Sequence, residues 1–479
     1  MVIGKTESKG RAHASLDASV LQKDIRGQVL TASDADFEKV ALDIWNKYGP
    51  IKRRPQLIVR VANEQDVVEA VKFARANKLK IAVRGGGHHW SNSTLRNSGL
   101  MIDLTNLNKI ISLDAKAHKA VVQPIISNRE IQAHLNAQNL SYPSGHCPPV
   151  KLSGYLLSGG MSWNQGVWGP GIGSVEAVEL VTPDGELITA NKDQNTDYYW
   201  AARGAGPAFF GVATRYQLKL YDLPKAIACS AYYCPIGEVG AVAEWLESIA
   251  SKLAPNIELS LFLLTAPLEL AEKCKADAGK VCMVTATIFA ESMGEVKSSL
   301  KPLDDCPIIA KCLSRTVAKP YTFEALFDAS GALWPMDHRN HVAAMFSDSN
   351  LADMLNAVSD HFLKTPSPTT LIMFAIFTGP NIPAPLPDAA FSMSAHYYGG
   401  PWTMWTKAED DEANTQWHEK CLDLLKPFVI GHYIGETDVV KYPDHVKGSY
   451  TENKWKRLEE LRKKYDPDGV FFNYSNGLS

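Results

Sequence analysis

The stretch that most constrains how this chain folds is Arg84-Gly85-Gly86-Gly87-His88-His89-Trp90. It follows an apolar run at residues 80–83, which predicts a strand entering a turn. Consecutive glycines allow backbone N–H groups to crowd around an anion, so strand and turn together indicate a phosphate cradle. A tight surface turn fits the same pattern. The G-x-G-x-x-G dinucleotide fingerprint does not fit, because Trp90 stands at the third glycine position.

Two loops of the sequence resemble those of a flavoenzyme family. Arg84-Gly85-Gly86-Gly87-His88 is similar to the R-x-G-G-H loop of the vanillyl-alcohol-oxidase and berberine-bridge-enzyme group of FAD oxidoreductases. The resemblance implies that His88 is bonded to the flavin 8α-methyl group; His89 would take its place only if the register is off by one. Gly145-His146-Cys147-Pro148-Pro149-Val150 resembles the G-x-C-x-x-V segment of doubly linked members, so Cys147 is expected on flavin C6.

Two further motifs follow in the family's order. Leu157-Ser158-Gly159-Gly160 resembles the glycine loop along the isoalloxazine ring, although Met161 replaces a third glycine. Residues 197–204 and 210–214 resemble D-L-F-W-A-x-R-G leading into F-G-V-V-T. The resemblance therefore implies FAD as the cofactor, attached covalently through His88 and Cys147. The cofactor-binding residues it implies are Arg84, Gly85, Gly86, Gly87, His88, His89, Ser91, Gly145, Cys147, Val150, Gly154, Gly159, Gly160, Val212 and Asn473.

The length of the chain and the resemblance together predict the domain organisation. At 479 residues the chain is too long for one ordinary core. The resemblance implies an α+β protein with a two-domain, PCMH-type FAD-binding fold: two α/β subdomains, plus a substrate domain built on an antiparallel sheet with helices on one face. We expect a lead-in at 1–50, the FAD-binding domain at 51–224, the substrate domain at 225–428 and a returning segment at 429–479.

Local patterns predict individual elements. Asn63 is expected to open a helix after a strand at 56–61, and Ser127 with Glu130 forms a capping box that opens a helix running to Leu140. A hairpin is expected around Pro183-Asp184-Gly185. The other expected helices are 34–47, 239–253 and 451–464, and the expected strands of the second domain are 258–265, 281–289, 371–377 and 391–399.

Composition excludes several classes of protein. A net charge of -3 argues against a nucleic-acid partner, and no apolar run is long enough for a membrane span. The first residues lack the apolar core of a secretory signal, so we expect a cytoplasmic enzyme; secretion stays open if the chain is a trimmed form. The eight cysteines lack C-x-x-C spacing, which favours reduced thiols and no metal site. We expect a monomer or a dimer.

The candidate proton acceptor lies late in the chain. His432 to Asp438 occupies the place of the family's Y-x-N-Y segment, in which Tyr433 matches the first tyrosine and Glu436 replaces the second. Strand alternation predicts that Tyr433 and Glu436 face opposite sides. A carboxyl group in an apolar pocket has a raised pKa and suits a general base, whereas a glutamate at a solvated loop end is the alternative.

Two neighbouring positions complete the catalytic candidates. His396 and Tyr398 share a face of the strand expected at 391–399, so both are expected to line the pocket while Tyr397 faces away. His146 lies beside Cys147 in the sequence and is expected to lower the pKa of its thiol. The catalytic candidates are therefore Glu436, Tyr433, His396 and Tyr398.

Val150 favours one reaction class. In the family, the side chain three residues after the linking cysteine gates oxygen, and valine or isoleucine there is typical of oxidases. The resemblance thus implies an oxidase that transfers hydride from a hydroxyl-bearing small molecule to FAD and reduces O₂ to H₂O₂. A dehydrogenase with another acceptor, or a ring-closing or desaturating flavoenzyme, is the alternative. A serine hydrolase is excluded because Asn164 breaks G-x-S-x-G after Gly160.

Overall fold

The computed structural model describes residues 17–49, 51–382 and 384–473. The first sheet along the chain is small and has the strand order β1-β2-β4-β3. Strands β2 (Leu57–Arg60) and β3 (Ile81–Arg84) both pair in parallel with β4 (Leu100–Asp103). Strand β1 (Gln28–Leu30) adds an antiparallel edge. The crossover helix α3 (Glu64–Ala76) begins where the Asn63 side chain accepts a hydrogen bond from Asp66 N, as expected.

A second sheet of the same half is antiparallel. Its order is β5-β6-β10-β8-β9, formed by β5 (Ile110–Asp114), β6 (Lys119–Val122), β10 (Val212–Lys219), β8 (Val175–Val181) and β9 (Leu187–Asn191). The expected hairpin is confirmed, because β8 and β9 pair antiparallel. The short helices α4 (Asn128–Asn136), α5 (Leu152–Leu157), α6 (Gln165–Trp168) and α7 (Thr196–Ala201) follow these strands. Ser127 and Glu130 form the capping box of α4.

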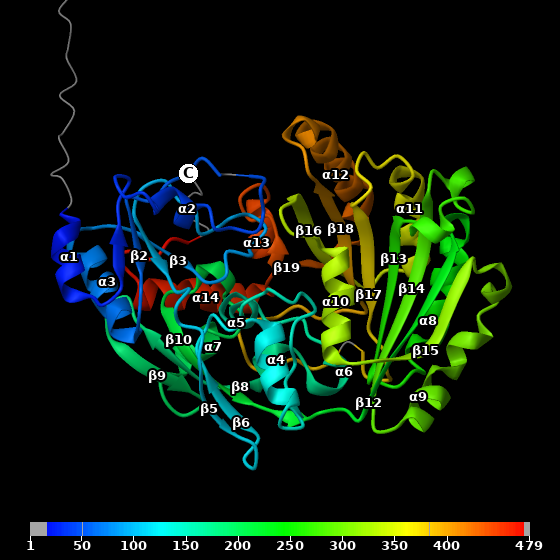
Figure 1. Ribbon diagram of the computed structural model, residues 1–479, viewed down its shortest axis with the longest axis horizontal. Coiled ribbons are helices and arrows are strands. Elements are labelled where there is room, and N and C mark those ends of the chain that lie inside the picture. The colour runs from blue at the N-terminus through cyan, green and yellow to red at the C-terminus, as the bar shows by residue number, and fades with distance from the viewer. Residues whose placement is uncertain (1–16, 50, 383, 474–479) are drawn as a thin grey trace, which may run out of the picture.

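The other half is one large antiparallel sheet with the order β15-β12-β14-β13-β17-β18-β16-β19 (Figure 1). Its strands are β12 (Ala226–Pro235), β13 (Ile257–Thr265), β14 (Lys280–Ala290), β15 (Ser314–Tyr321), β16 (Arg339–Ser347), β17 (Leu371–Ile376), β18 (Tyr397–Trp405) and β19 (Gly431–Thr437). The antiparallel second sheet expected from the sequence is confirmed.

Helices cover one face of this large sheet. They are α8 (Val239–Ala250), α9 (Met293–Leu300), α11 (Leu351–Phe362) and α12 (Asp411–Leu425), and their apolar sides form one buried core with the sheet. Helix α10 (Phe323–Leu333) is different, because it lies on the opposite face beside α4 of the first half (Figure 1). The two-domain α+β fold is therefore present, with α10 at the boundary between its halves.

The C-terminal segment connects both halves. Strand β19 pairs with β16 of the large sheet, so the return to the first half begins after this strand and not at residue 429. Helix α13 (Pro443–Lys447) follows, and α14 (Glu452–Tyr465) buries Leu458 and Leu461 in the core of the first half. Phe471 then bridges in parallel to Ile81 of β3. The other predicted domain boundaries stay predictions.

Three predicted elements are wrong at their ends, and each has a local cause. The helix expected at 34–47 is only α2 (Phe37–Ala41), since Trp45 N bonds to Gly87 O in the glycine loop. Helix α4 stops at Asn136 because the backbone turns left-handed at Asn139 (φ 56°). The strand expected at 391–399 begins at Tyr397, because Phe391 N bonds to Arg203 O across the halves. No disulfide joins any of the eight cysteines.

Among the described residues, no helix has the length and apolarity that a membrane crossing requires.

Candidate active site

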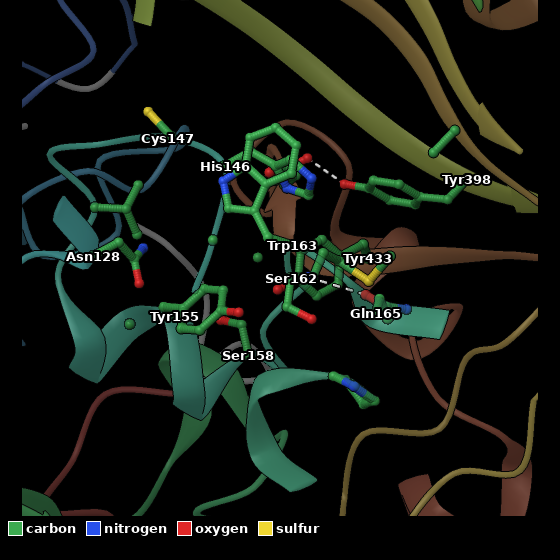
Figure 2. A pocket seen from close by; sticks show the side chains of 18 of the residues that line it. Asn128, His146, Cys147, Tyr155, Ser158, Ser162, Trp163, Gln165, Tyr398 and Tyr433 are labelled. Carbon is green, nitrogen blue, oxygen red and sulfur yellow. Dashed lines mark hydrogen bonds between the residues drawn. The ribbon is translucent and has the colours of Figure 1, made fainter. Parts of the chain in front are cut away.

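A cavity of about 940 Å³ lies between the two halves. Its walls are the loops of the first half on one side and the uncovered face of the large sheet on the other. Figure 2 shows Cys147, Tyr155 and Trp163 projecting from the loop side, and Tyr398 and Tyr433 from the sheet side. The volume is near the upper end of what small-molecule and cofactor sites occupy.

The glycine loop forms one wall of the cavity. Gly85, Gly86 and Gly87 line it, and Gly87 adopts φ 64°, where an added Cβ would lie 2.6 Å from Asp43 O. Arg84 does not line it, contrary to expectation: its buried guanidinium pairs with Asp103 at 2.7 Å and donates to Val40 O. Arg84 thus holds the start of the glycine loop from the side away from the cavity, where Asp103 neutralises its charge.

His88 projects from this loop into the cavity. Its ring stacks on Trp45 with centroids 4.5 Å apart and an interplanar angle of 20°. Burial lowers the pKa of His88 to about 4, so the imidazole is neutral near pH 7. A neutral imidazole retains a nitrogen lone pair and is a competent nucleophile.

His89 lines the cavity, but both of its ring nitrogens are engaged. Nδ1 lies 2.8 Å from Ser91 Oγ, and Nε2 lies 3.3 Å from the carbonyl oxygen of Ile434. Ser91 was expected to bind the cofactor, but it is buried and does not line the cavity. Its hydroxyl positions the His89 ring instead. The hydrogen bonds favour His88 over His89 as the residue that is free to react.

Cys147 reaches the same wall from the second loop. Its Sγ lies 3.7 Å from Nε2 of His88. The expectation that His146 lowers the pKa of this thiol is wrong: burial first, and then the charge of Glu436, raise the pKa of Cys147 to about 12. The His146 ring instead packs on Trp163 at 4.0 Å between centroids, with Nε2 3.2 Å from Glu258 Oε2.

Other residues expected to hold the cofactor divide into two groups. Gly145, Val150 and Gly154 line the cavity. Gly159 and Gly160 do not: Gly159 has φ 120° and a Cβ there would lie 2.5 Å from the Phe391 ring, while Gly160 N donates to Tyr433 Oη at 3.2 Å.

Two more expected contacts are displaced by one residue. Val212 is buried in the core of the first half, whereas its neighbours Gly211 and Ala213 line the cavity. Asn473 is not a lining residue, although Phe472 before it is. In both cases the expected segment reaches the cavity, but the residue that lines the cavity is a sequence neighbour of the expected one.

Glu436, Tyr398 and Tyr433 lie together on the sheet side, where Tyr398 contacts both of the others. Tyr398 Oη donates to Glu436 Oε2, and the Tyr398 and Tyr433 rings meet edge to face at 5.7 Å (Figure 2). Burial raises the pKa of Glu436 above its ordinary value, as a general base near neutral pH requires. The hydrogen bond from Tyr398 partly offsets this effect, because it stabilises the carboxylate.

The predicted alternation between Tyr433 and Glu436 is wrong. Both side chains line the same cavity. The register of β19 against β16 shifts between the pairs Ala343↔Thr437 and Met345↔His432, so extra residues of β19 are accommodated there. Such an irregularity re-aims side chains that regular pleating would send to opposite faces.

His396 lies outside the cavity, which corrects its expected place. It is 48% exposed and its Nδ1 lies 2.6 Å from Asp348 Oδ1, just before β18 begins. Tyr397 faces away from the cavity as expected, and its hydroxyl donates to Glu247. The predicted alternation of side chains is therefore correct for Tyr398. It is wrong for His396, because β18 begins only at Tyr397 and His396 precedes it.

The cavity fits a ligand with a planar apolar body and polar edges. Thr94 Oγ1, Asn128 Nδ2 and Trp163 Nε1 are buried in its lining and have no hydrogen-bond partner among the described residues. Buried polar groups of this kind cost free energy unless a ligand pairs them. Asn128, Trp163, Trp45 and Glu258 were not predicted, because only their places in the fold bring them to the cavity.

Comparisons with known proteins agree with this site. Residues 55–191 match FAD_binding_4, the FAD binding domain family. The FAD-linked oxidoreductase nodO of Hypoxylon pulicicidum is 27% identical over 432 residues, covering 90% of this chain and 93% of that protein.

Two solved structures share the fold. The structure of 6-hydroxy-D-nicotine oxidase from Arthrobacter nicotinovorans superimposes with a TM-score of 0.79 at 21% identity, over 94% of this chain and 97% of that one. The BBE-like 1 protein of Physcomitrella patens gives 0.80 at 17% identity, over 95% and 97%. The chain is thus an FAD-dependent oxidoreductase, and it resembles the vanillyl-alcohol-oxidase and berberine-bridge-enzyme group in its motifs and shares the fold of these two structures.

Proposed function

We propose that the protein is an oxidase whose FAD is attached through both His88 and Cys147. The observation that carries this proposal is the meeting of the two nucleophiles, 3.7 Å apart on one wall of the cavity. When bound, FAD accepts a hydride from the substrate and passes two electrons to O₂, which gives H₂O₂. Thr94, Asn128 and the backbone of Gly85, Gly86 and Gly87 would hold its polar parts.

The two attachment residues are suited to different steps. His88 is neutral and supplies a lone pair directly. The Cys147 thiol stays protonated at neutral pH and needs a base, and the nearest ring nitrogen belongs to His88. Each attachment would replace an N–H or S–H bond of the protein and a C–H bond of the flavin by one new bond, with O₂ as the oxidant that would take up the two protons and two electrons as H₂O₂.

Glu436 is the proposed general base. Its carboxylate removes the proton of the substrate hydroxyl as the hydride leaves the adjacent carbon. Tyr398 holds the carboxylate by donating a hydrogen bond to Oε2, and Tyr433 is itself held by Gly160 N. The substrate is a small molecule that bears a hydroxyl group, and O₂ is the second substrate.

Val150 supports the choice of O₂ as the acceptor. It lines the cavity three residues after Cys147, and it is smaller by one methylene than leucine, which the resemblance to the family implies would block O₂. One added methylene in a filled site costs about 1–3 kcal/mol, enough to exclude a small molecule that must share the space. A relative with the same fold carries the name oxidase.

Anaerobic reduction followed by exposure to air tests the proposal. Photoreduced enzyme mixed with aerated buffer should regain its flavin absorption within seconds and release one H₂O₂ per flavin. If reoxidation takes many minutes while an artificial dye reoxidises the flavin quickly, the protein is a dehydrogenase. A ring-closing or desaturating role is recognised by a product that is cyclised or unsaturated in place of a carbonyl compound.

A further inference from the structure

The sheet side of the cavity is a wall of aromatic and methionine side chains. Phe262 of β13, Met283 of β14, Met373 of β17 and Trp402 of β18 all line it, and they belong to one apolar cluster with Tyr398 and Phe346. Flat rings and polarizable thioethers pack well against the faces of a ring-bearing ligand.

Charges in the cavity are divided between its sides. Among the described lining residues, the lysine and arginine are Lys151 and Arg96, and both come from the first half. The carboxylates are Glu258 and Glu436, and both come from the large sheet. An acidic ligand against the sheet would bring a third negative charge beside these two carboxylates, which costs free energy in a partly desolvated site.

Glu258 is fixed in position and still accessible. His146 Nε2 lies 3.2 Å from its Oε2, and the His146 ring is itself packed on Trp163. The Glu258 side chain retains 18% exposure at the cavity wall. A carboxylate has about four acceptor positions, so those not used by His146 are available to a donor of the ligand. The proposed mechanism makes no use of this pair.

We propose that the substrate is an apolar, ring-bearing molecule without an acidic group, and that Glu258 accepts a hydrogen bond from a hydroxyl or amine of it other than the reacting one. This rests on the proposed function, because Glu436 is reserved there for the reacting hydroxyl. Glu258 binds and orients the substrate and takes no part in proton removal. Acids and phosphorylated compounds of the same apolar body are excluded by charge.

Three matched probes test this with the holoenzyme: 4-phenylbutan-1-ol, 4-phenylbutylamine and 4-phenylbutyrate. They share one ring and one chain length and differ only in the end group, which stands for the second polar group of the substrate and not for the reacting hydroxyl. Their dissociation constants come from the change in flavin absorption on titration, without turnover. The alcohol and the amine should bind at least about tenfold more tightly than the acid. Glu258→Gln should weaken both about 10- to 100-fold, the range of a hydrogen bond to a charged group.

Asp348→Asn is the matched control, since Asp348 also pairs with a histidine but lies outside the cavity. It should leave all three constants unchanged. A second variant, Ser260→Lys, adds a cation two residues from Glu258 on the same strand and should restore binding of the acid. Flavin content and melting temperature establish that each variant is folded.

Equal binding of the acid and the alcohol overturns the proposal, as does unchanged binding of the alcohol and amine in Glu258→Gln or a failure of all three probes to bind. These outcomes are separate from those of the air-reoxidation experiment. Slow reoxidation removes the oxidase assignment and leaves the binding constants as they are, because no probe has to be oxidised.

Discussion

Sγ of Cys147 lies 3.7 Å from Nε2 of His88, although the two residues come from different loops of the first half. The glycine loop at the end of β3 presents the histidine, and the segment before α5 presents the cysteine. Burial raises the pKa of the thiol to about 12 and lowers that of the imidazole to about 4. The Cys147 thiol is therefore protonated at neutral pH, and Nε2 of His88 is the ring nitrogen that lies beside it.

Val150→Leu should slow reoxidation of the reduced enzyme by O₂. The added methylene fills space at the cavity wall and costs about 1–3 kcal/mol for any O₂ that must enter it, or about 5- to 150-fold in rate. Stopped-flow absorption in aerated buffer measures the rate, and reduction of an artificial dye should be unchanged. Val167→Leu, at a position 53% exposed, is the control. Equal reoxidation rates in wild type and Val150→Leu would remove Val150 from the oxygen path.

Glu436→Gln should reduce the rate of flavin reduction about 10²–10⁴-fold, because an amide cannot take the substrate proton. Rapid mixing with substrate under anaerobic conditions isolates this step from reoxidation. Asp348→Asn serves as the control carboxylate outside the cavity. An unchanged rate in Glu436→Gln would mean that another group accepts the proton.

Tyr398→Phe should move the pH profile of flavin reduction upward. The base acts as the carboxylate, so the rate rises with pH through the pKa of Glu436. Burial raises this pKa and the hydrogen bond from Tyr398 lowers it, so loss of the hydroxyl raises it further. The measurement is the rate of flavin reduction as a function of pH, from acidic to alkaline buffer. A profile that stays in place or moves down contradicts this assignment.

Three histidines in and beside the large sheet should make the protein sensitive to acid. Burial lowers the pKa of His341 to about 3 and those of His432 and His445 to about 4. The unfolded chain takes up these protons near pH ~6.5. The contribution of these histidines to the free energy of unfolding is therefore fully present above that pH. It is lost as the pH falls toward 4, because the unfolded chain binds protons there that the folded protein does not bind.

The melting temperature at pH 7 and pH 5 measures this loss. His341→Phe keeps a ring in the stack with His418 and should narrow the difference between the two values. His134→Phe, on the exposed side of α4, should leave it as in wild type. A difference that is unchanged in His341→Phe would show that other groups cause the acid sensitivity.

Gly87→Ala should lower the flavin content of the purified protein. The position has φ 64°, and the new Cβ would lie 2.6 Å from Asp43 O, so the loop must move. The ratio of absorption at 450 and 280 nm reports the bound flavin. Gly237→Ala is the control, because a Cβ there meets nothing within 4 Å. Full flavin content in Gly87→Ala would show that the loop tolerates displacement.

The loops that carry the chemistry were predictable from the sequence, since each is a short motif whose residue types are fixed by its turn and its ligand. His88, Cys147, Val150, Tyr398 and Glu436 all line the cavity as expected. The antiparallel substrate sheet was predictable from its long alternating strands. These features depend on neighbours along the chain.

Features that depend on distant neighbours were not predictable. Arg84 turns away from the cavity because Asp103 on β4 pairs with it, and His396 turns outward to Asp348. Tyr433 and Glu436 share a face because β19 is irregular opposite β16, which no periodicity reveals. Glu258 belongs to the site because its strand lies opposite the loop that carries His146, and this long-range contact has no signal in the local sequence.

Mass spectrometry of tryptic peptides from the purified, denatured protein tests the central claim most directly. The account predicts one species in which the peptide containing His88 and the peptide containing Cys147 are joined through a single FAD, with a mass lower by four hydrogens than the sum of its parts. Cys147→Ala should leave FAD on the His88 peptide alone, and the double variant with His88→Ala should carry none. Unmodified His88 and Cys147 peptides from a yellow wild-type protein would contradict the account.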